Sequence, residues 1–366
     1  MRGGEVRFPA LAEIVPGELV VRVHLHELPT VNGLEACWTF VSEGLWTLGQ
    51  KEILLTLKRE PGEKPEDFPR AVFFFYGLMH ELAAQGKFVD AGGCTDFGEQ
   101  GLLGRRAAGY IEPYRFSEFA PLSPSLSAIL LTEGEFAACQ AIGLSRIRAL
   151  LGKAYSHFPC PPWSDRRRPS VVTKDALKTS LLARATMLNA SGAVASCEKG
   201  LLTLRVPQGA RSRLAAGLEP IGDDGAFAII SELDPSADGC LVWTPGETRP
   251  GAISRPDVTP ERVTGCFLAA APVAGATADR TQFVEDGFLL SLTAASFRAL
   301  REALKRGGAL ALPASPDRFH LEWAAPAEPI DEPLFKIAAL QPISAPVPLE
   351  SMTRGRNSGR RAAALE

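Results

Sequence analysis

The sequence lacks any long apolar run. Its most apolar stretch, residues 71–79, is far shorter than the roughly 20 residues that a helix needs to cross a bilayer. The N-terminal residues, Met1 to Glu5, lead into no apolar segment of the kind that directs secretion. We therefore expect a cytoplasmic protein without integral membrane association.

Closely spaced cysteines are also missing. The seven cysteines are an odd number, and the nearest pair in sequence, Cys139 and Cys160, is 21 positions apart. No C-x-x-C pair is present to form a zinc finger or a thioredoxin-like site, and the spacing is not that of a small disulfide-rich domain. We expect reduced thiols, most of them packed as small apolar side chains.

Metal and cofactor motifs are equally scarce. His24 and His26 lie on one face of an expected strand while Glu27 points away, and no other ligand cluster accompanies them. The sequence contains neither G-x-x-x-x-G-K-[ST] nor a strand-borne G-x-G-x-x-G, so the glycines between residues 92 and 109 predict a long loop with turns rather than a phosphate cradle. We predict no metal site and no cofactor.

A catalytic constellation is not recognisable either. Ser145 lacks the second glycine of G-x-S-x-G because Ile147 occupies that position. No set of nucleophile, base and oxyanion donors is apparent, so we predict no catalytic residues and take binding as the default function. The net charge of −3 provides no broad basic field, which argues against a nucleic-acid partner.

What the chain does contain is enough apolar material for a large core. Its 366 residues are 46% hydrophobic and 22% charged, as expected for one large or two ordinary globular domains. Alternating or apolar segments predict strands at 19–26, 38–41, 53–57, 127–131, 135–142, 201–206, 226–230, 239–243, 263–270, 287–292 and 319–323.

Helices are predicted between these strands. The first spans residues 65–86 and is apolar almost all round, so we expect it to be largely buried, with Phe74 under other segments. Shorter helices are expected at 144–151, ending at Gly152, and at 175–188. Thr293 caps a helix from Ala294 to Lys305, which Gly307 ends.

These elements indicate an α+β protein with mixed β-sheets and packed helices, arranged in two closely packed halves. The predicted divisions are an N-terminal extension (1–18), a first half (19–170), a second half (171–325) and a proline-rich, then basic tail (326–366) that we expect to be flexible.

Motifs spread over residues 19–323 resemble the C-terminal domain of Smad anchor for receptor activation and endofin, which are endosomal scaffold proteins. The resemblance rests on Cys37-Trp38 with Phe40, Gly44, Gly49-Gln50, Glu52-Ile53, Gln100, Leu103-Gly104, Gly109, Pro159-Cys160-Pro161, Arg262-Val263-Thr264-Gly265, Val284-Glu285-Asp286-Gly287, Leu300-Arg301, Ala303-Leu304 and the segment from His320 to Trp323. It implies a binding function. This chain has no FYVE finger and no identifiable Smad-binding segment, so endosomal targeting is not implied.

The first half also resembles a Suppressor of fused domain. A glycine turn and strand at residues 49–57, the helix at 65–84 and Leu130-Leu131-Thr132-Glu133 carry this likeness. Suppressor of fused members bind proteins, and bacterial members of the superfamily are regarded as immunity proteins. The resemblance implies an immunity-type protein that neutralises a toxin, or a scaffold.

The predicted contact residues lie in the loop at 158–168, which we expect on the surface. They are Trp163, Asp165, Arg166, Arg167 and Arg168, because an aromatic ring beside guanidinium groups offers contact area and bidentate bonding to acidic groups. A solvated basic loop is the alternative for the same residues.

Two other functions stay open. A cysteine hydrolase would use Cys160 activated by His157, although Cys160 lies between two prolines and a packed structural role is favoured. An adaptor for membrane surfaces or phosphoinositides would need the arginines to form one basic face.

Overall fold

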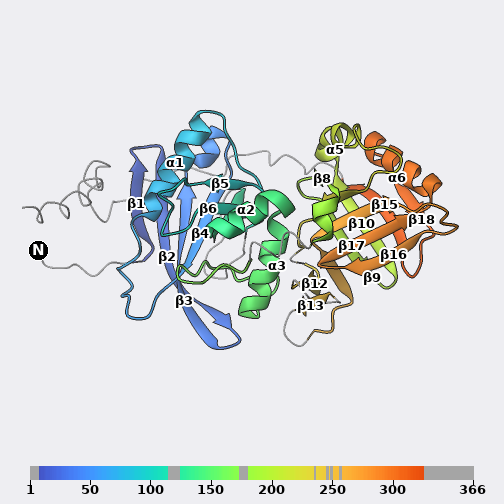
Figure 1. Ribbon diagram of the computed structural model, residues 1–366. Coiled ribbons are helices and arrows are strands. Elements are labelled where there is room, and N and C mark those ends of the chain that lie inside the picture. Colours follow the sequence, from blue (N-terminus) through green and yellow to red (C-terminus); the bar gives the residue numbers. More distant parts are fainter. Residues whose placement is uncertain are drawn as a thin grey trace, which may run out of the picture.

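The computed structural model describes residues 8–113, 124–172, 180–234, 236–244, 247, 250–254 and 258–324. The chain forms two halves that lie side by side, each built on β-sheet with helices packed against it (Figure 1). This arrangement confirms the predicted α+β class with mixed sheets. The predicted tail at 326–366 lies outside the described residues.

One seven-stranded sheet, in the order β1-β2-β3-β4-β7-β6-β5, forms the first half. Its strands are β1 (Ala10–Val15), β2 (Leu19–Thr30), β3 (Gly33–Glu43), β4 (Glu52–Lys58), β5 (Cys94–Asp96), β6 (Ala107–Ile111) and β7 (Ser125–Leu131). Only β4 and β7 pair in parallel, which makes the sheet mixed. Strand β1 was not predicted, because its six residues were assigned to the N-terminal extension.

The glycine-rich stretch at 92–109 is not one long loop. It contains β5 and most of β6, and Gly109 lies within β6. A Cβ at Gly109 would lie 2.8 Å from Cδ1 of Leu144. This glycine therefore permits a close approach of helix to strand rather than a turn.

Helix α1 (Val72–Ala84) covers one face of this sheet. It begins at Val72 rather than at Pro65 as predicted, because Pro69 has no backbone N–H and restricts the residue before it. The predicted burial is confirmed along most of the helix, whose exposed positions form one stripe. Phe74 lies in that stripe and is 40% exposed, so the prediction that it lies under other segments was wrong.

Helices α2 (Glu133–Ile142) and α3 (Leu144–Tyr155) cover the opposite face. The strand predicted at 135–142 was wrong, because Thr132 and Glu135 form a capping box that starts α2. The predicted end of α3 at Gly152 was also wrong. A Cβ there would lie 2.3 Å from the carbonyl oxygen of Pro159, so this glycine permits close packing inside the helix.

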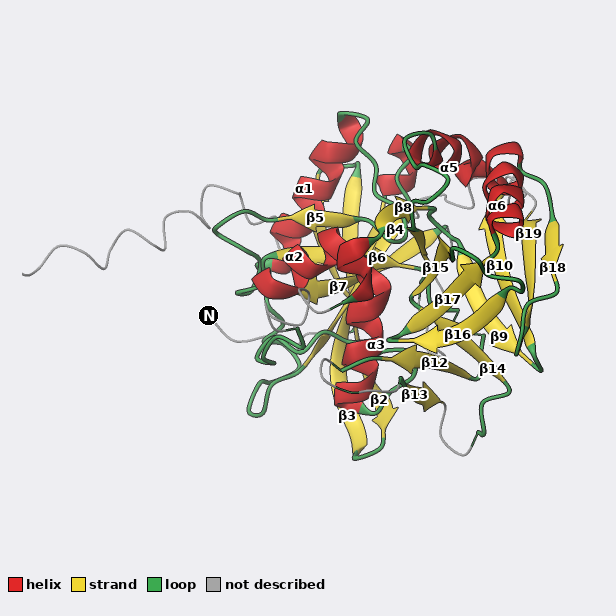
Figure 2. Cartoon of the chain, turned by 45° about the vertical axis from the view of Figure 1, so that its right-hand side comes forward, coloured by secondary structure: helices red, strands yellow, loops and turns green. Residues whose placement is uncertain are grey.

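The second half contains two sheets that share a core with two helices. One sheet has the order β13-β12-β14-β9-β10-β19-β18 and the other the order β16-β17-β15-β11-β8. The strands are β8 (Thr186–Asn189), β9 (Val194–Glu198), β10 (Leu201–Pro207), β11 (Phe227–Ile230), β12 (Gly239–Val242), β13 (Gly251–Ser254), β14 (Arg262–Gly265), β15 (Phe267–Pro272), β16 (Arg280–Val284), β17 (Gly287–Leu292), β18 (Leu310–Leu312) and β19 (Arg318–Ala324), with helices α5 (Arg211–Leu218) and α6 (Ala294–Arg306). In Figure 2 both helices lie at the same end of these sheets.

Two predictions in this half need correction. The single strand predicted at 263–270 is two strands, β14 and β15, which belong to different sheets. The chain crosses between sheets at Gly265, where a Cβ would lie 2.7 Å from the ring of Phe288. The helix predicted at 175–188 is a short 3-10 helix, Leu181–Arg184, followed by β8, while residues 173–179 lie outside the described part.

Helix α6 agrees with its local sequence signals. The Thr293 hydroxyl accepts a hydrogen bond from the backbone N–H of Ser296 at 3.2 Å, and Gly307 ends the helix in the left-handed region. Because this cap satisfies an N–H that has no partner within the helix, Thr293→Ala should lower the free energy of unfolding by about 1 kcal/mol. Urea denaturation followed by circular dichroism measures the change. An unchanged midpoint would contradict the capping role.

A buried ionic cluster joins the two halves. Arg146 on α3 donates from Nε to Asp286 Oδ2 at 2.6 Å, from Nη2 to Glu285 Oε2 at 2.7 Å and from Nη1 to Ser180 Oγ at 2.9 Å. Its guanidinium also lies 5.1 Å from the ring centroid of Trp243. The Arg146 and Asp286 side chains are only 3% and 1% exposed, so these contacts form part of the interior between the halves.

Candidate interaction site

The segment that carries the predicted contact residues enters the first sheet. After α3 the chain returns, and Ser164 lies between β4 and β7 where these strands diverge. Its N–H donates to the Thr56 carbonyl at 2.8 Å, its carbonyl accepts from Lys58 N at 3.1 Å, and its hydroxyl accepts from Leu130 N at 3.0 Å. Ser164 therefore pairs with the sheet as a strand residue would. The segment that contains it is not the surface loop that was predicted.

Trp163 is buried as a consequence. Its side chain is 5% exposed and packs in a cluster with Leu28, Cys37, Val41 and Leu54. The His157 ring lies edge-on to the indole with the centroids 5.3 Å apart. The expected exposure of Trp163 was wrong, because Ser164 anchors the chain between two strands and its aromatic neighbour must then enter the core.

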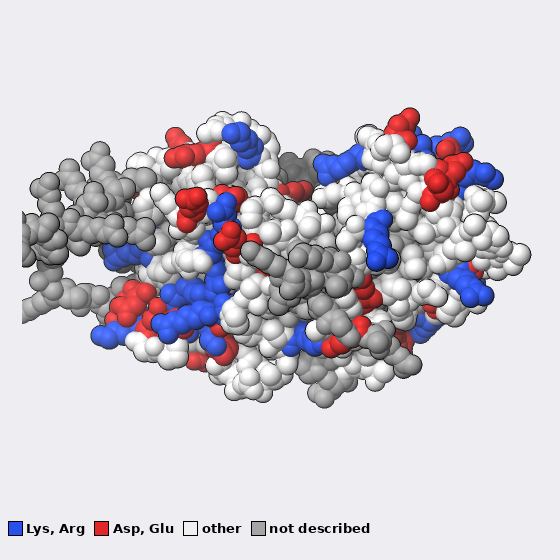
Figure 3. Space-filling model, viewed as in Figure 1, with Lys and Arg blue, Asp and Glu red and all other residues white. Residues whose placement is uncertain are grey.

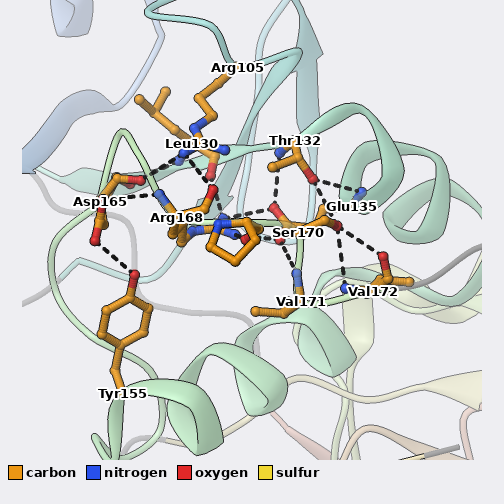
Figure 4. A network of polar contacts seen from close by, with 12 residues as sticks. Arg105, Leu130, Thr132, Glu135, Tyr155, Asp165, Arg168, Ser170, Val171 and Val172 are labelled. Carbon is orange, nitrogen blue, oxygen red and sulfur yellow. Dashed lines mark hydrogen bonds and ion pairs between the residues drawn. The ribbon is translucent and has the colours of Figure 1, made fainter.

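Arg168 belongs to a buried ion pair with Glu135 (Figure 4), whose side chain is fully buried. Arg168 Nη2 donates to Glu135 Oε2 at 2.7 Å and to the Leu130 carbonyl at 3.0 Å. Glu135 also accepts the backbone N–H groups of Thr132 and Val171, each at 2.9 Å. Burial alone would raise the pKa of Glu135, but Arg168 brings it below its ordinary value.

Asp165 shapes the turn that precedes Arg168. Its Oδ1 accepts from the backbone N–H groups of Arg167 at 2.8 Å and Arg168 at 3.1 Å, and its Oδ2 accepts from the Tyr155 hydroxyl at 3.1 Å. Arg105 Nη2 lies 2.5–3.1 Å from the carbonyl oxygens of Asp165, Arg166 and Arg168. These contacts fix the backbone that presents the side chain of Arg167.

Arg167 is the exposed member of the predicted set, with a side chain that is 76% exposed. Its Nε lies 3.4 Å from Glu60 Oε2, whereas Arg166 is mostly buried and pairs with Glu63 at 2.5 Å. Figure 3 shows basic side chains gathered beside acidic ones over the part of the first half that contains β2 and β3.

The β2–β3 hairpin adds apolar area that the sequence analysis did not single out. Val31 and Leu34 are 60% and 66% exposed at its tip. Next to this tip, β3 contacts the chain that leads to Glu60, the partner of Arg167: Arg59 N donates to the Ala36 carbonyl at 2.9 Å, and Lys58 pairs with Glu35 at 3.0 Å. The sequence did contain a signal for this apolar area, because Val31 and Leu34 directly flank the Asn32-Gly33 turn. We call Val31, Leu34 and Arg167 the hairpin–arginine surface.

The geometry around Cys160 does not favour a thiol nucleophile. Cys160 is completely buried, and burial lowers the pKa of the neighbouring His157. A substrate cannot reach the Cys160 sulfur in this arrangement, so the open cleft that a cysteine hydrolase needs is absent at this position.

His24 and His26, the two histidines of β2, differ in their surroundings. His26 Nε2 lies 2.8 Å from the Thr39 hydroxyl, and burial, followed by the charge of Arg22, lowers the pKa of His24 to about 4. Within the described residues no group of three or more histidine, cysteine or acidic side chains could bind a metal ion. In the same part of the chain no helix is long and apolar enough to span a membrane.

Comparison with known protein families assigns the chain to one of them. The family described as Smad anchor for receptor activation-like, C-terminal, matches residues 120–318, which is more than half of the chain. The chain belongs to this family. The match confirms the resemblance found in the sequence.

Curated relatives agree with the assignment. Human zinc finger FYVE domain-containing protein 9 is 25% identical over 288 residues, which cover 74% of this chain and 20% of the relative. Mouse zinc finger FYVE domain-containing protein 16 is 25% identical over 316 residues, which cover 81% of this chain and again 20% of the relative. The chain thus spans about a fifth of the length of these relatives.

A solved structure is also similar. The crystal structure of Drosophila Suppressor of Fused aligns over 82% of this chain and 87% of its own, with 9% sequence identity and a TM-score of 0.35. This likeness is too distant to add to the family assignment.

Proposed function

We propose that this chain is a non-enzymatic protein-interaction module that binds another polypeptide. Membership of a family described as anchor-like supports this function. The relatives are about four times as long as this chain, so only the surface of this chain bears on the chemistry of its partner.

The observation that carries the proposal is the hairpin–arginine surface. Arginine is enriched among the energetically important residues of protein interfaces, and exposed apolar side chains add surface that a partner can remove from water. Val31 and Leu34 supply apolar area, and Arg167 supplies a guanidinium for bidentate bonding to a carboxylate. The partner segment should therefore combine an apolar side chain with an acidic one.

Arg167 is available for such a contact. Its side chain is largely in water and its Nε lies 3.4 Å from Oε2 of Glu60, a carboxylate that is itself only 9% exposed. The guanidinium carries five N–H donors, so a partner carboxylate can bind it while the contact with Glu60 is kept. We propose that the other four predicted residues, Trp163, Asp165, Arg166 and Arg168, act indirectly by fixing the backbone around Arg167.

Within this function we propose a cytoplasmic protein of the immunity or scaffold type. An immunity protein would bind and neutralise a toxin, whereas a scaffold would bind a signalling polypeptide. Both require a stoichiometric complex, and the identity of the captured protein distinguishes them.

The experiment compares three forms of the full-length protein as bait in lysate of the source cell. The test form carries Val31→Ser, Leu34→Ser and Arg167→Ala together. Its matched control carries Phe283→Ser and Arg205→Ala, two exposed positions in the second half. We expect the wild type and the control to retain one stoichiometric protein and the test form to bind it at least about tenfold more weakly.

Two results would overturn different parts of the proposal. Equal affinity of the test form and the wild type would remove the hairpin–arginine surface as the contact. If no protein co-purifies in stoichiometric amount with the wild type and only a small metabolite does, the interaction-module function itself is wrong.

A further inference from the structure

Two cysteines from distant parts of the sequence lie in contact. Cys94 Sγ on β5 is 2.9 Å from Cys139 Sγ in the last turn of α2, although the residues are 45 positions apart. A disulfide bond is about 2.05 Å long, so the two sulfurs need to approach by less than 1 Å. Cys94 pairs across the sheet with Gly109, which has no side chain, and both cysteines belong to the cluster under α2 and α3.

Cys94 is also more accessible than the other thiols of the described residues. Cys94 is partly exposed, whereas every other cysteine is buried. Cys139 lines a cavity of about 210 Å³ between the two halves, which gives a small oxidant a route to the pair. Burial raises the pKa of Cys37 and of Cys240 to about 12, and a thiol of that kind is seldom ionised.

The electrostatics favour Cys94 as the attacking sulfur. A hydrogen bond from Cys139 stabilises the Cys94 thiolate and lowers its pKa. The same contact and burial raise the pKa of Cys139, so Cys139 stays protonated as the resolving thiol.

We propose that Cys94 and Cys139 are a reversible redox site that forms a disulfide between β5 and α2 on exposure to a hydroperoxide. The Cys94 thiolate attacks one peroxide oxygen and breaks the O–O bond, which gives a sulfenic acid and hydroxide. The Cys139 sulfur then attacks the Cys94 sulfur, and the sulfenic oxygen leaves as water with the Cys139 proton. In total, two thiols and one hydrogen peroxide give one disulfide and two waters.

The disulfide would attach an edge strand of the first sheet to the helix on its surface. It would close a loop of 45 residues, and a cross-link over such a loop restricts the unfolded chain. We expect oxidation to raise Tm by on the order of 5–10 °C. Formation of this disulfide does not require the proposed partner binding, because neither cysteine belongs to the hairpin–arginine surface.

The test treats native full-length protein with hydrogen peroxide, blocks the remaining thiols and maps peptides without reduction. We expect a peptide pair joined through Cys94 and Cys139 that dithiothreitol separates, together with the rise in Tm. Cys94→Ser and Cys139→Ser should each abolish both effects. Cys197→Ala, which removes a buried thiol from β9, should keep both.

The proposal is overturned if treated wild type yields no peptide linked through these two residues. It is also overturned if Cys94 proceeds to sulfinic acid while Cys139 stays a free thiol, because a competent resolving thiol captures the sulfenic acid first. Linked peptides from other cysteine pairs at equal yield would count against it in the same way.

Discussion

Arg146→Met is expected to destabilise the protein by about 3–5 kcal/mol, since removal of one partner leaves buried charge without compensation. Arg146 contacts Asp286 and Glu285, and both the arginine and Asp286 are almost completely buried. Methionine keeps much of the side-chain volume, so the loss reports mainly on the charge. Urea denaturation at pH 7 gives the change in the free energy of unfolding. A change below about 1 kcal/mol would show that the cluster does not connect the two halves.

The same variant should respond to pH in a defined direction. Burial raises the pKa of Asp286, an effect that Arg146 opposes in the wild type. Without Arg146 the folded-state pKa of Asp286 lies further above its unfolded-state value, so the folded variant binds more protons than the unfolded one. Stability of the variant relative to the wild type should therefore increase as pH falls from 7 toward 5. Arg205→Met, which disrupts an exposed pair with Glu322, is the control and should change stability by less than about 1 kcal/mol.

Glu135→Ala should have an effect of similar size. This substitution leaves the Arg168 guanidinium buried without its carboxylate and removes the acceptor of two backbone N–H groups. We expect a loss of about 3–5 kcal/mol in urea denaturation. Glu322→Gln serves as the exposed control.

A double-mutant cycle separates the ion pair from the other contacts of Glu135. If the cost arises mainly from unpaired Arg168, adding Arg168→Met to Glu135→Ala should recover part of the lost stability. Strictly additive losses would mean that the two side chains do not interact, which contradicts the contacts in Figure 4.

Local signals in the sequence predict several elements well. Helix α6 has a threonine cap, basic residues in its last turn and a glycine after it, and all of these act within a few residues. The strands predicted at 19–26 and 38–41 lie within β2 and β3, which pair as a hairpin around Asn32-Gly33. The Thr132-x-x-Glu135 pattern was equally local, and it could have predicted α2 in place of a strand.

The burial of Trp163 and Arg168 was not predictable in the same way. It depends on Ser164 entering between β4 and β7, whose separation in space is set by pairing between residues about 70 positions apart. An arginine-rich segment is usually on the surface, and only the distant Glu135 makes burial of Arg168 favourable. The crossing between two sheets at Gly265 also depends on a distant residue, Phe288. Residues 263–270 alone therefore do not predict it.

Stability and binding are connected through residues 163–168. Glu135 and Arg105 fix the backbone on both sides of Arg167, so a variant that loosens them also loses the orientation of the exposed guanidinium. A loss of binding in Glu135→Ala would therefore reflect a change in folding as well as any loss of partner contacts. The substitutions that test binding, Val31→Ser, Leu34→Ser and Arg167→Ala, change only exposed side chains.

Site-specific photo-crosslinking in the source cell tests the central claim most directly. A photoreactive amino acid at position 34 is compared with the same group at position 283, which is also an exposed apolar position but lies in the second half. The interaction-module function through the hairpin–arginine surface predicts one prominent cross-linked protein from position 34, its loss when Arg167→Ala is added, and no such product from position 283. Cross-linking of the same protein from position 283 but not from position 34 would contradict it.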